Sequence, residues 1–159
     1  MEQKKLNIDY VEYLDRSELG ESDRLLVEKA SEVARNSYAP YSEFNVGAAV
    51  LLDNGEIVTG SNQENAAFPS GLCAERVAIF YANSKYPAAK IVALSVTALQ
   101  AVEPVYPCGA CRQVIAESEK RGGVPIRIII DGNSVVQVME GSRSLLPFTF
   151  DDIPQGQRI

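Results

Sequence analysis

The chain has 159 residues, a length typical of one compact domain with its own hydrophobic core. Hydrophobic residues make up 46% of the sequence and charged residues 23%, a composition that excludes disordered and fibrous proteins. The net charge of −6 has the wrong sign for binding a phosphate backbone, so we expect a soluble globule that binds no nucleic acid polymer.

The first half of the chain predicts one helix and one hairpin. Residues 1–20 are polar and are expected to be an N-terminal extension, followed by a single domain over residues 21–159. A helix should begin near Ser22 and end before Pro40, because apolar residues in between recur at helical spacing. Asn54-Gly55 is a hairpin signal. The strands that it predicts cover residues 44–52 and 56–60.

The second half predicts two more helices, which begin near Cys73 and Cys111, and three more strands. The strands cover residues 90–99, 125–130 and 135–139. The helix that begins near Cys111 connects strands 90–99 and 125–130, which are therefore expected to be parallel. The three residues after Ile130 are too few for a crossover, so the last strand should be antiparallel to the strand before it. The expected fold is α/β, a three-layer α/β/α sandwich around a mixed five-stranded sheet.

Cellular location and cysteine usage limit the chemistry. The N-terminus lacks the apolar segment of a secretory signal, and no stretch approaches the length of a membrane span, so we expect a cytoplasmic protein without membrane contact. Three cysteines cannot all pair in one chain, which favours reduced thiols used in catalysis or metal binding. Histidine is absent, so the chemistry would depend on carboxylates, thiolates or a bound ion.

The cysteines lie at the starts of two predicted helices, as Cys73-Ala-Glu75 and Pro107-Cys108-Gly-Ala-Cys111. A helix N-terminus lowers the pKa of a thiol and favours the thiolate that Zn²⁺ requires. Three thiolates with one open position are typical of a catalytic zinc site, because a structural site would normally have a fourth protein ligand. We therefore predict that Cys73, Cys108 and Cys111 bind Zn²⁺.

Three charged residues follow the predicted ligands closely. Glu75 lies two residues after Cys73, where its carboxylate can reach water beside the ion and move protons in place of the missing histidine. Arg76 and Arg112 directly follow Glu75 and Cys111, and either guanidinium could hydrogen-bond to thiolates and reduce the negative charge at the metal. Buried structural cysteines or a redox pair are the alternatives, but the combination of both motifs favours a catalytic metal centre.

At these residues the sequence resembles the cytidine deaminase family in its short homotetrameric form. The resemblance extends from about residue 38 to residue 150 and includes residues 40–49, 62–66 and 145–147. It implies a cytidine deaminase-like fold, one zinc ion per subunit and a homotetramer. It also implies deamination of free cytidine and 2′-deoxycytidine to uridine and 2′-deoxyuridine, with release of ammonia, in pyrimidine salvage.

The resemblance extends to residues that would contact the substrate. Asn62 and Glu64 match residues that hold the ribose 3′-hydroxyl, and Phe44 matches an aromatic residue that packs on the pyrimidine. The backbone N–H of Ala74 matches the donor to the base carbonyl, and Phe150 matches an aromatic residue lent to a neighbouring subunit. The alternatives are an ordinary polar loop at residues 62–65 and core positions for both phenylalanines; the zinc motif favours the pocket, and the resemblance favours the two aromatic contacts.

The sequence departs from the family pattern at two positions. Phe68 stands where many members have tyrosine, so a hydroxyl contact to the sugar or across subunits would be lost. Tyr106 stands where a serine or threonine is usual, and its ring could narrow the site. Cysteine at position 73, where editing and nucleotide deaminases have histidine, favours free nucleosides as substrates.

Two other functions stay open from the sequence. An aminopyrimidine-antibiotic deaminase of the blasticidin type would share the zinc motif, although the sugar-binding pattern at residues 62–65 argues against it. A zinc-stabilised nucleoside-binding protein without turnover would need an idle Glu75 or a blocked water position, and Tyr106 is the residue that leaves this possibility open.

Overall fold

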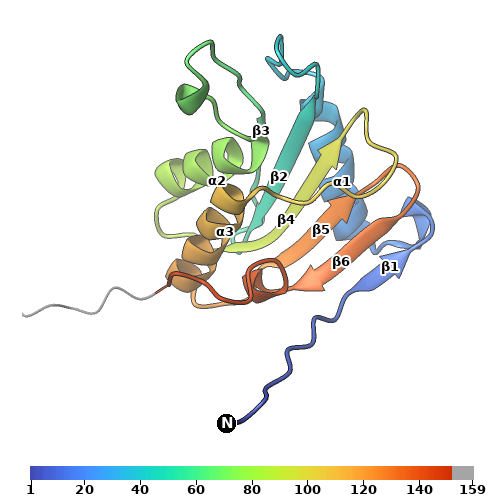
Figure 1. Cartoon of the computed structure of the whole chain (residues 1–159). Coiled ribbons are helices and arrows are strands. Elements are labelled where there is room, and N and C mark those ends of the chain that lie inside the picture. The colour runs from blue at the N-terminus through green and yellow to red at the C-terminus, as the bar shows by residue number, and fades with distance from the viewer. Residues whose placement is uncertain (152–159) are drawn as a thin grey trace, which may run out of the picture.

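One mixed sheet forms the centre of the computed structural model, which describes residues 1–151 (Figure 1). Its strands lie in the order β1-β6-β5-β4-β2-β3. They are β1 (Val11–Tyr13), β2 (Val46–Leu52), β3 (Ile57–Ser61), β4 (Ile91–Ala98), β5 (Arg127–Asp131) and β6 (Val136–Glu140). β4 and β5 are parallel, and the other neighbouring strands are antiparallel. The predicted antiparallel last strand is therefore confirmed.

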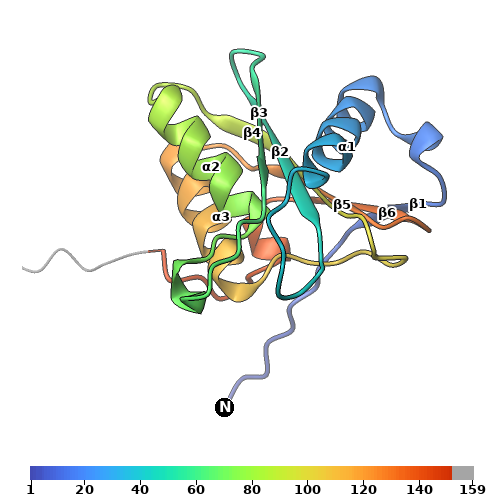
Figure 2. The same cartoon turned by 90° about the horizontal axis from the view of Figure 1, so that it is seen from above.

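Helices cover both faces of the sheet, as Figure 2 shows. α1 (Glu21–Ala34) lies on one face, and α2 (Ala74–Lys85) and α3 (Gly109–Gly122) lie side by side on the other. The three-layer α/β/α sandwich is confirmed. None of the helices in the described part of the chain has the length and apolar character that a membrane crossing needs.

Within residues 1–151 the sheet has six strands rather than the five predicted, because part of the predicted N-terminal extension joins it. Val11 to Tyr13 form β1, whose register pairs Val11 with Val138 and Tyr13 with Val136. A strand of three residues is too short to show a periodicity in the sequence. The division into an extension and a single domain stays a prediction, and its end, residues 152–159, lies outside the described residues.

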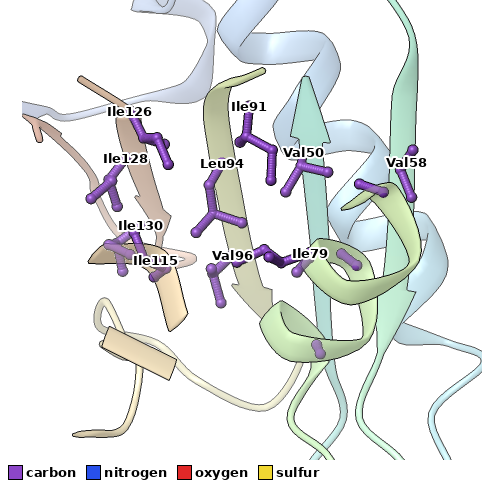
Figure 3. Close-up of a cluster of buried hydrophobic side chains, with 14 of the residues drawn as sticks. Val50, Val58, Ile79, Ile91, Leu94, Val96, Ile115, Ile126, Ile128 and Ile130 are labelled. Atoms are coloured by element: carbon purple, nitrogen blue, oxygen red, sulfur yellow. The ribbon is translucent and has the colours of Figure 1, made fainter. Parts of the chain in front are cut away.

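Buried apolar side chains fill both spaces between the sheet and the helices. On the α2 and α3 side, Leu94 and Val96 of β4 pack with Ile79 of α2 and Ile115 of α3 (Figure 3). On the α1 side, Ile129 packs with side chains of α1. Because the central strands are covered on both faces, they are apolar at nearly every position. Each large side chain buried in this way stabilises the fold by about 1.5–3 kcal/mol.

Glycine at position 60 lets α2 approach β3 at very short range. A Cβ atom at Gly60 would lie 2.5 Å from the backbone nitrogen of Ala78 and 2.8 Å from the carbonyl oxygen of Ala74. Both clashes involve helix backbone, which cannot rotate away as a side chain can. The absence of a side chain at Gly60 therefore sets the distance between the sheet and the first turn of α2.

We expect Gly60→Ala to lower the free energy of unfolding by about 1–3 kcal/mol, because it forces α2 away from the sheet. Thermal unfolding monitored by circular dichroism would measure this loss as a lower Tm. Gly122→Ala is the matched control, because a Cβ there would meet Lys90 at an ordinary 3.5 Å. That variant should unfold like the original protein, and an equally unchanged Tm for Gly60→Ala would refute the steric argument.

Candidate metal centre and active site

The N-termini of α2 and α3 bring the three cysteine side chains together. Cys73 is the residue before the first turn of α2, Cys108 occupies the same position before α3, and Cys111 lies in the first turn of α3. The three sulfur atoms all lie within 4.8 Å of one another. The Cys73 sulfur is 3.8 Å from that of Cys108, which is 3.5 Å from that of Cys111.

These separations fit a shared metal ion and do not fit a disulfide bond. Zn–S bonds of about 2.3 Å in a tetrahedral site place the sulfur atoms about 3.8 Å apart, whereas a disulfide requires about 2.05 Å. All three cysteines are free thiols. Within the described residues, no fourth cysteine, histidine or carboxylate belongs to the cluster. The donor set therefore suits a zinc ion that keeps one open coordination position.

The protonation of the cluster also favours a cation. Hydrogen bonding to Cys111, supported by the Arg76 guanidinium, lowers the pKa of Cys73 to about 5. The same hydrogen bond, together with burial, raises the pKa of Cys111. The surroundings of Cys73 thus favour its thiolate, the form that binds a cation. Binding of a divalent cation to all three thiolates would release the remaining thiol protons.

Glu75 is the carboxylate nearest to the cluster in sequence, and α2 buries it. It lies in the first turn of α2 and is 4% exposed. Burial, reinforced by the negative charge of Cys73, raises the pKa of Glu75 above that of an ordinary glutamate. A carboxyl group with a raised pKa both accepts and returns protons more readily near neutral pH. The environment of Glu75 therefore suits proton transfer.

The two arginines occupy different places. A terminal nitrogen of Arg76 lies 3.9 Å from the Cys73 sulfur and 3.4 Å from the carbonyl oxygen of Gly71. Arg112 donates instead to the carbonyl oxygens of Pro107, at 2.7 Å, and Leu145, at 2.8 Å. Of the two arginines, only Arg76 hydrogen-bonds to a thiol within residues 1–151. Arg112 fastens the turn before Cys108, and its predicted effect on the metal charge stays a prediction.

A pocket of about 470 Å³ opens beside Cys73. Both polar side chains and aromatic rings line it. Tyr41 and Phe68 contact each other edge to face, with ring centroids 5.8 Å apart. The lining residues that matter for the site are Cys73, Arg76, Asn62, Glu64, Tyr41 and Phe68. The pocket thus joins a thiol ligand to polar groups that can hold a small hydrophilic molecule.

Asn62 and Glu64 line this pocket and also hold one of its edges. The Asn62 amide accepts a hydrogen bond from the Val46 backbone N–H and donates one to the Phe44 carbonyl oxygen, both at 2.9 Å. The Glu64 carboxylate accepts hydrogen bonds from the backbone N–H groups of residue 41, at 2.8 Å, and residue 42, at 3.3 Å. Hydrogen bonds from Ser42 and then from residue 41 hold the pKa of Glu64 below its ordinary value.

Sequence reasoning missed this second role of Asn62 and Glu64. The two side chains fasten the segment over residues 41–46, which leads through Phe44 to the start of β2 at Val46. The only signal in the sequence was the alternative that residues 62–65 are a polar loop, because such side chains often bond to nearby backbone. Support of the turn and a role in binding are compatible, since each contact uses only part of the side chain.

The remaining predicted residues lie in three different environments. Ala74 is buried as the first residue of α2, where backbone N–H groups have no partner within the helix. Phe44 is half-buried and does not line the pocket. Phe150 is 68% exposed, and its carbonyl oxygen accepts a hydrogen bond from Gln113 at 2.7 Å. Tyr106 directs its hydroxyl to Gln137 of β6 and does not line the pocket either.

An α/β/α sandwich with three thiols and a buried carboxyl group at adjoining helix N-termini is the framework of a metal-dependent hydrolytic enzyme. Comparison with known proteins identifies the kind of hydrolytic enzyme. Residues 20–124 match the family model described as the cytidine and deoxycytidylate deaminase zinc-binding region. The chain therefore belongs to this family of hydrolytic deaminases and carries its zinc-binding region.

Individual relatives and solved structures agree with this assignment. A cytidine deaminase of Sporosarcina psychrophila is 40% identical over 124 residues, which cover 75% of this chain and 89% of the relative. A cytidine deaminase of Mycobacterium tuberculosis is 37% identical over 131 residues, or 81% of this chain and 91% of the relative. The crystal structure of cytidine deaminase from Burkholderia pseudomallei matches with a TM-score of 0.70 and 35% identity, over 79% of this chain and 97% of that one.

Proposed function

We propose that the protein deaminates free cytidine and 2′-deoxycytidine to uridine and 2′-deoxyuridine, releasing ammonia, as a cytoplasmic enzyme of pyrimidine salvage. The observation that carries this proposal is the pocket that joins Cys73 of the thiol cluster to Asn62 and Glu64. Cytidine is the substrate named for the similar proteins from Sporosarcina psychrophila and Mycobacterium tuberculosis.

The reaction would combine a metal ion with one proton carrier. Zn²⁺ held by Cys73, Cys108 and Cys111 would supply a Lewis acid at its open position. Glu75 accepts a proton from the water that attacks C4 of the pyrimidine. It delivers this proton to N3, then takes the second proton from the hydroxyl now on C4 and passes it to the amino group, which leaves as ammonia while the C4 carbonyl forms. Arg76 stabilises the thiolate of Cys73 throughout, through its positive charge.

Base and sugar would be held by separate groups. Phe44, whose carbonyl oxygen is held by the pocket residue Asn62, would pack against the pyrimidine once the nucleoside is bound, and the Ala74 backbone N–H would donate to the base carbonyl. Asn62 and Glu64 hold the 3′-hydroxyl of the sugar. Glu64 contacts the turn through Oε2, which leaves Oε1 to accept from a hydroxyl, and Asn62 uses one of its two amide protons on the Phe44 carbonyl. Both nucleosides carry a 3′-hydroxyl, so both fit this arrangement.

A homotetramer completes the proposal, with Phe150 contributing to the site of a neighbouring subunit. Phe150 is largely exposed on its own chain, as are Phe68, Phe80 and Tyr81. Large apolar side chains on the surface are characteristic of protein interfaces, in which aromatic residues are enriched. Burial of these rings between subunits would also account for Phe68, which is 75% exposed in the single chain.

Ultraviolet absorbance on mixing zinc-loaded protein with each of four compounds would test the proposed function. Cytidine and deoxycytidine should be turned over, whereas 2′,3′-dideoxycytidine should show a kcat/KM about 10- to 100-fold lower, because Asn62 and Glu64 lose their partner. Blasticidin S should not react. Turnover of blasticidin S alone would favour an antibiotic deaminase, and tight nucleoside binding without turnover would contradict the proposal.

A further inference from the structure

The loop that leads to Cys108 depends on side-chain contacts for its position. This ligand loop, residues 99–107, connects β4 to α3 and passes the end of β5 on the way (Figure 1). Cys108 itself is exposed, whereas Cys111 is fully buried within α3. Packing therefore fixes Cys111 directly. The position of Cys108 depends on how firmly the ligand loop is held.

The first half of the ligand loop is attached to the turn after β5. The backbone N–H of Ser134 donates to the carbonyl oxygen of Val102 at 2.9 Å, and the Ser134 hydroxyl donates to the same oxygen at 3.0 Å. The Asn133 amide donates to the carbonyl oxygen of Ala101. Gly132 lies so close to the ligand loop that a Cβ atom at Gly132 would be 2.6 Å from the backbone nitrogen of Pro104. The loop thus lies directly on residues 132–134.

The second half of the ligand loop is attached to β1 through a chain of hydrogen bonds. The Tyr106 hydroxyl donates to Oε1 of Gln137, whose Nε2 donates to the Glu12 carboxylate at 2.8 Å. Gln137 is only 8% exposed, so its amide has few alternative partners. A carboxylate acceptor polarises the amide and strengthens the bond that its oxygen receives from Tyr106.

A second path leads from the N-terminal segment to the same loop. The Arg16 guanidinium binds Asp131 through two hydrogen bonds of 2.8 Å, and Asp131 is 2% exposed. Arg16 also donates to the side-chain oxygen of Asn133 at 3.2 Å, and Asn133 in turn holds Ala101. Both paths start within residues 11–18, which precede the residues that match the family model.

We propose that residues 11–18, the N-terminal segment, position the ligand loop and thereby determine how firmly Cys108 holds the metal ion. Glu12 acts through Gln137 on Tyr106, two residues before Cys108, and Pro107 between them restricts the backbone of Tyr106 to extended conformations. Movement at Tyr106 is therefore transmitted to the Cys108 sulfur. Glu12 and Tyr106 are positioning residues and take no part in proton transfer.

The rate of zinc transfer from the loaded protein to a chromogenic chelator tests this proposal without any substrate. Tyr106→Phe and Glu12→Ala should each accelerate zinc transfer about 3- to 10-fold, because each removes one link of the same chain. The double variant should be no faster than the faster single variant, since two breaks in one chain have the effect of one. Amide hydrogen exchange of residues 99–107 in the metal-free variants should be faster as well.

Tyr86→Phe is the matched control, because it also removes one hydroxyl hydrogen bond, to Glu56 at 3.1 Å, away from the ligand loop. It should transfer zinc at the original rate. The proposal is overturned if Tyr106→Phe transfers zinc no faster than this control, or if the effects of Tyr106→Phe and Glu12→Ala multiply independently. A wild-type protein that holds zinc but does not deaminate cytidine would refute the proposed function and leave this test intact.

Discussion

Glu75→Gln is expected to abolish turnover of cytidine while leaving nucleoside binding intact. Glutamine has nearly the same shape and keeps the packing of the first turn of α2, but it cannot carry a proton at neutral pH. The chain has no histidine, and in the proposed mechanism the three thiols hold the metal ion, so the proton transfer depends on Glu75. We expect kcat to fall about 10⁴-fold, the upper end of the range for a general acid–base group.

Two measurements separate this chemical loss from a structural one. Zinc content and Tm of Glu75→Gln should equal those of the original protein, because the ligands are unchanged. Cytidine affinity measured by calorimetry should stay within a few-fold. A variant that keeps more than about one tenth of the original kcat would show that another group transfers the proton, since only a small part of a general acid–base effect would then be lost.

Cys111→Ser should release the metal ion, and all activity with it. A serine hydroxyl stays protonated at neutral pH and does not replace a thiolate as a zinc ligand. Position 111 is fully buried in the first turn of α3, so no water can take the ligand's place without disturbing the helix. Because metal binding contributes to folding free energy, the variant should also show a lower Tm than the zinc-loaded protein.

Wild-type protein stripped by a chelator is the control for this prediction. Its Tm should approach that of Cys111→Ser, and added zinc should restore activity to the stripped protein only. Zinc content of the variant after gel filtration, measured by atomic absorption, should be below about one tenth of an ion per chain, because two thiolates bind zinc far more weakly than three. A full zinc complement in Cys111→Ser would exclude Cys111 as a ligand.

Much of the architecture was predictable because its signals are local. Helical spacing of apolar residues located α1, α2 and α3, and Asn54-Gly55 located the turn between β2 and β3. The short connection after β5 required an antiparallel partner, which β6 is. The position of Cys73 and Cys108 at helix starts also follows from patterns within a few residues. Such signals depend on neighbours in the chain, so they are visible before folding.

Other features depend on residues that are far apart in sequence, and the sequence contained no local sign of them. Edge strand β1 forms only because β6 offers an unpaired edge more than a hundred residues later. Both arginines lie within four residues of a helix start, yet packing directs Arg76 to a thiol and Arg112 to two carbonyl oxygens. Packing likewise brings the buried amide of Gln137 on β6 within hydrogen-bonding distance of the Tyr106 hydroxyl, although the two residues are distant in sequence.

The sequence by itself therefore determined the kind of chemistry. It places three thiols and one carboxylate at two helix starts, in a chain without histidine. The tertiary structure alone decided that these groups meet. Cys73 and Cys108 are 35 residues apart, and their sulfur atoms come within 3.8 Å because α2 and α3 pack side by side on one face of the sheet. The close approach at Gly60 and the buried apolar contacts of both helices with the sheet bring that about.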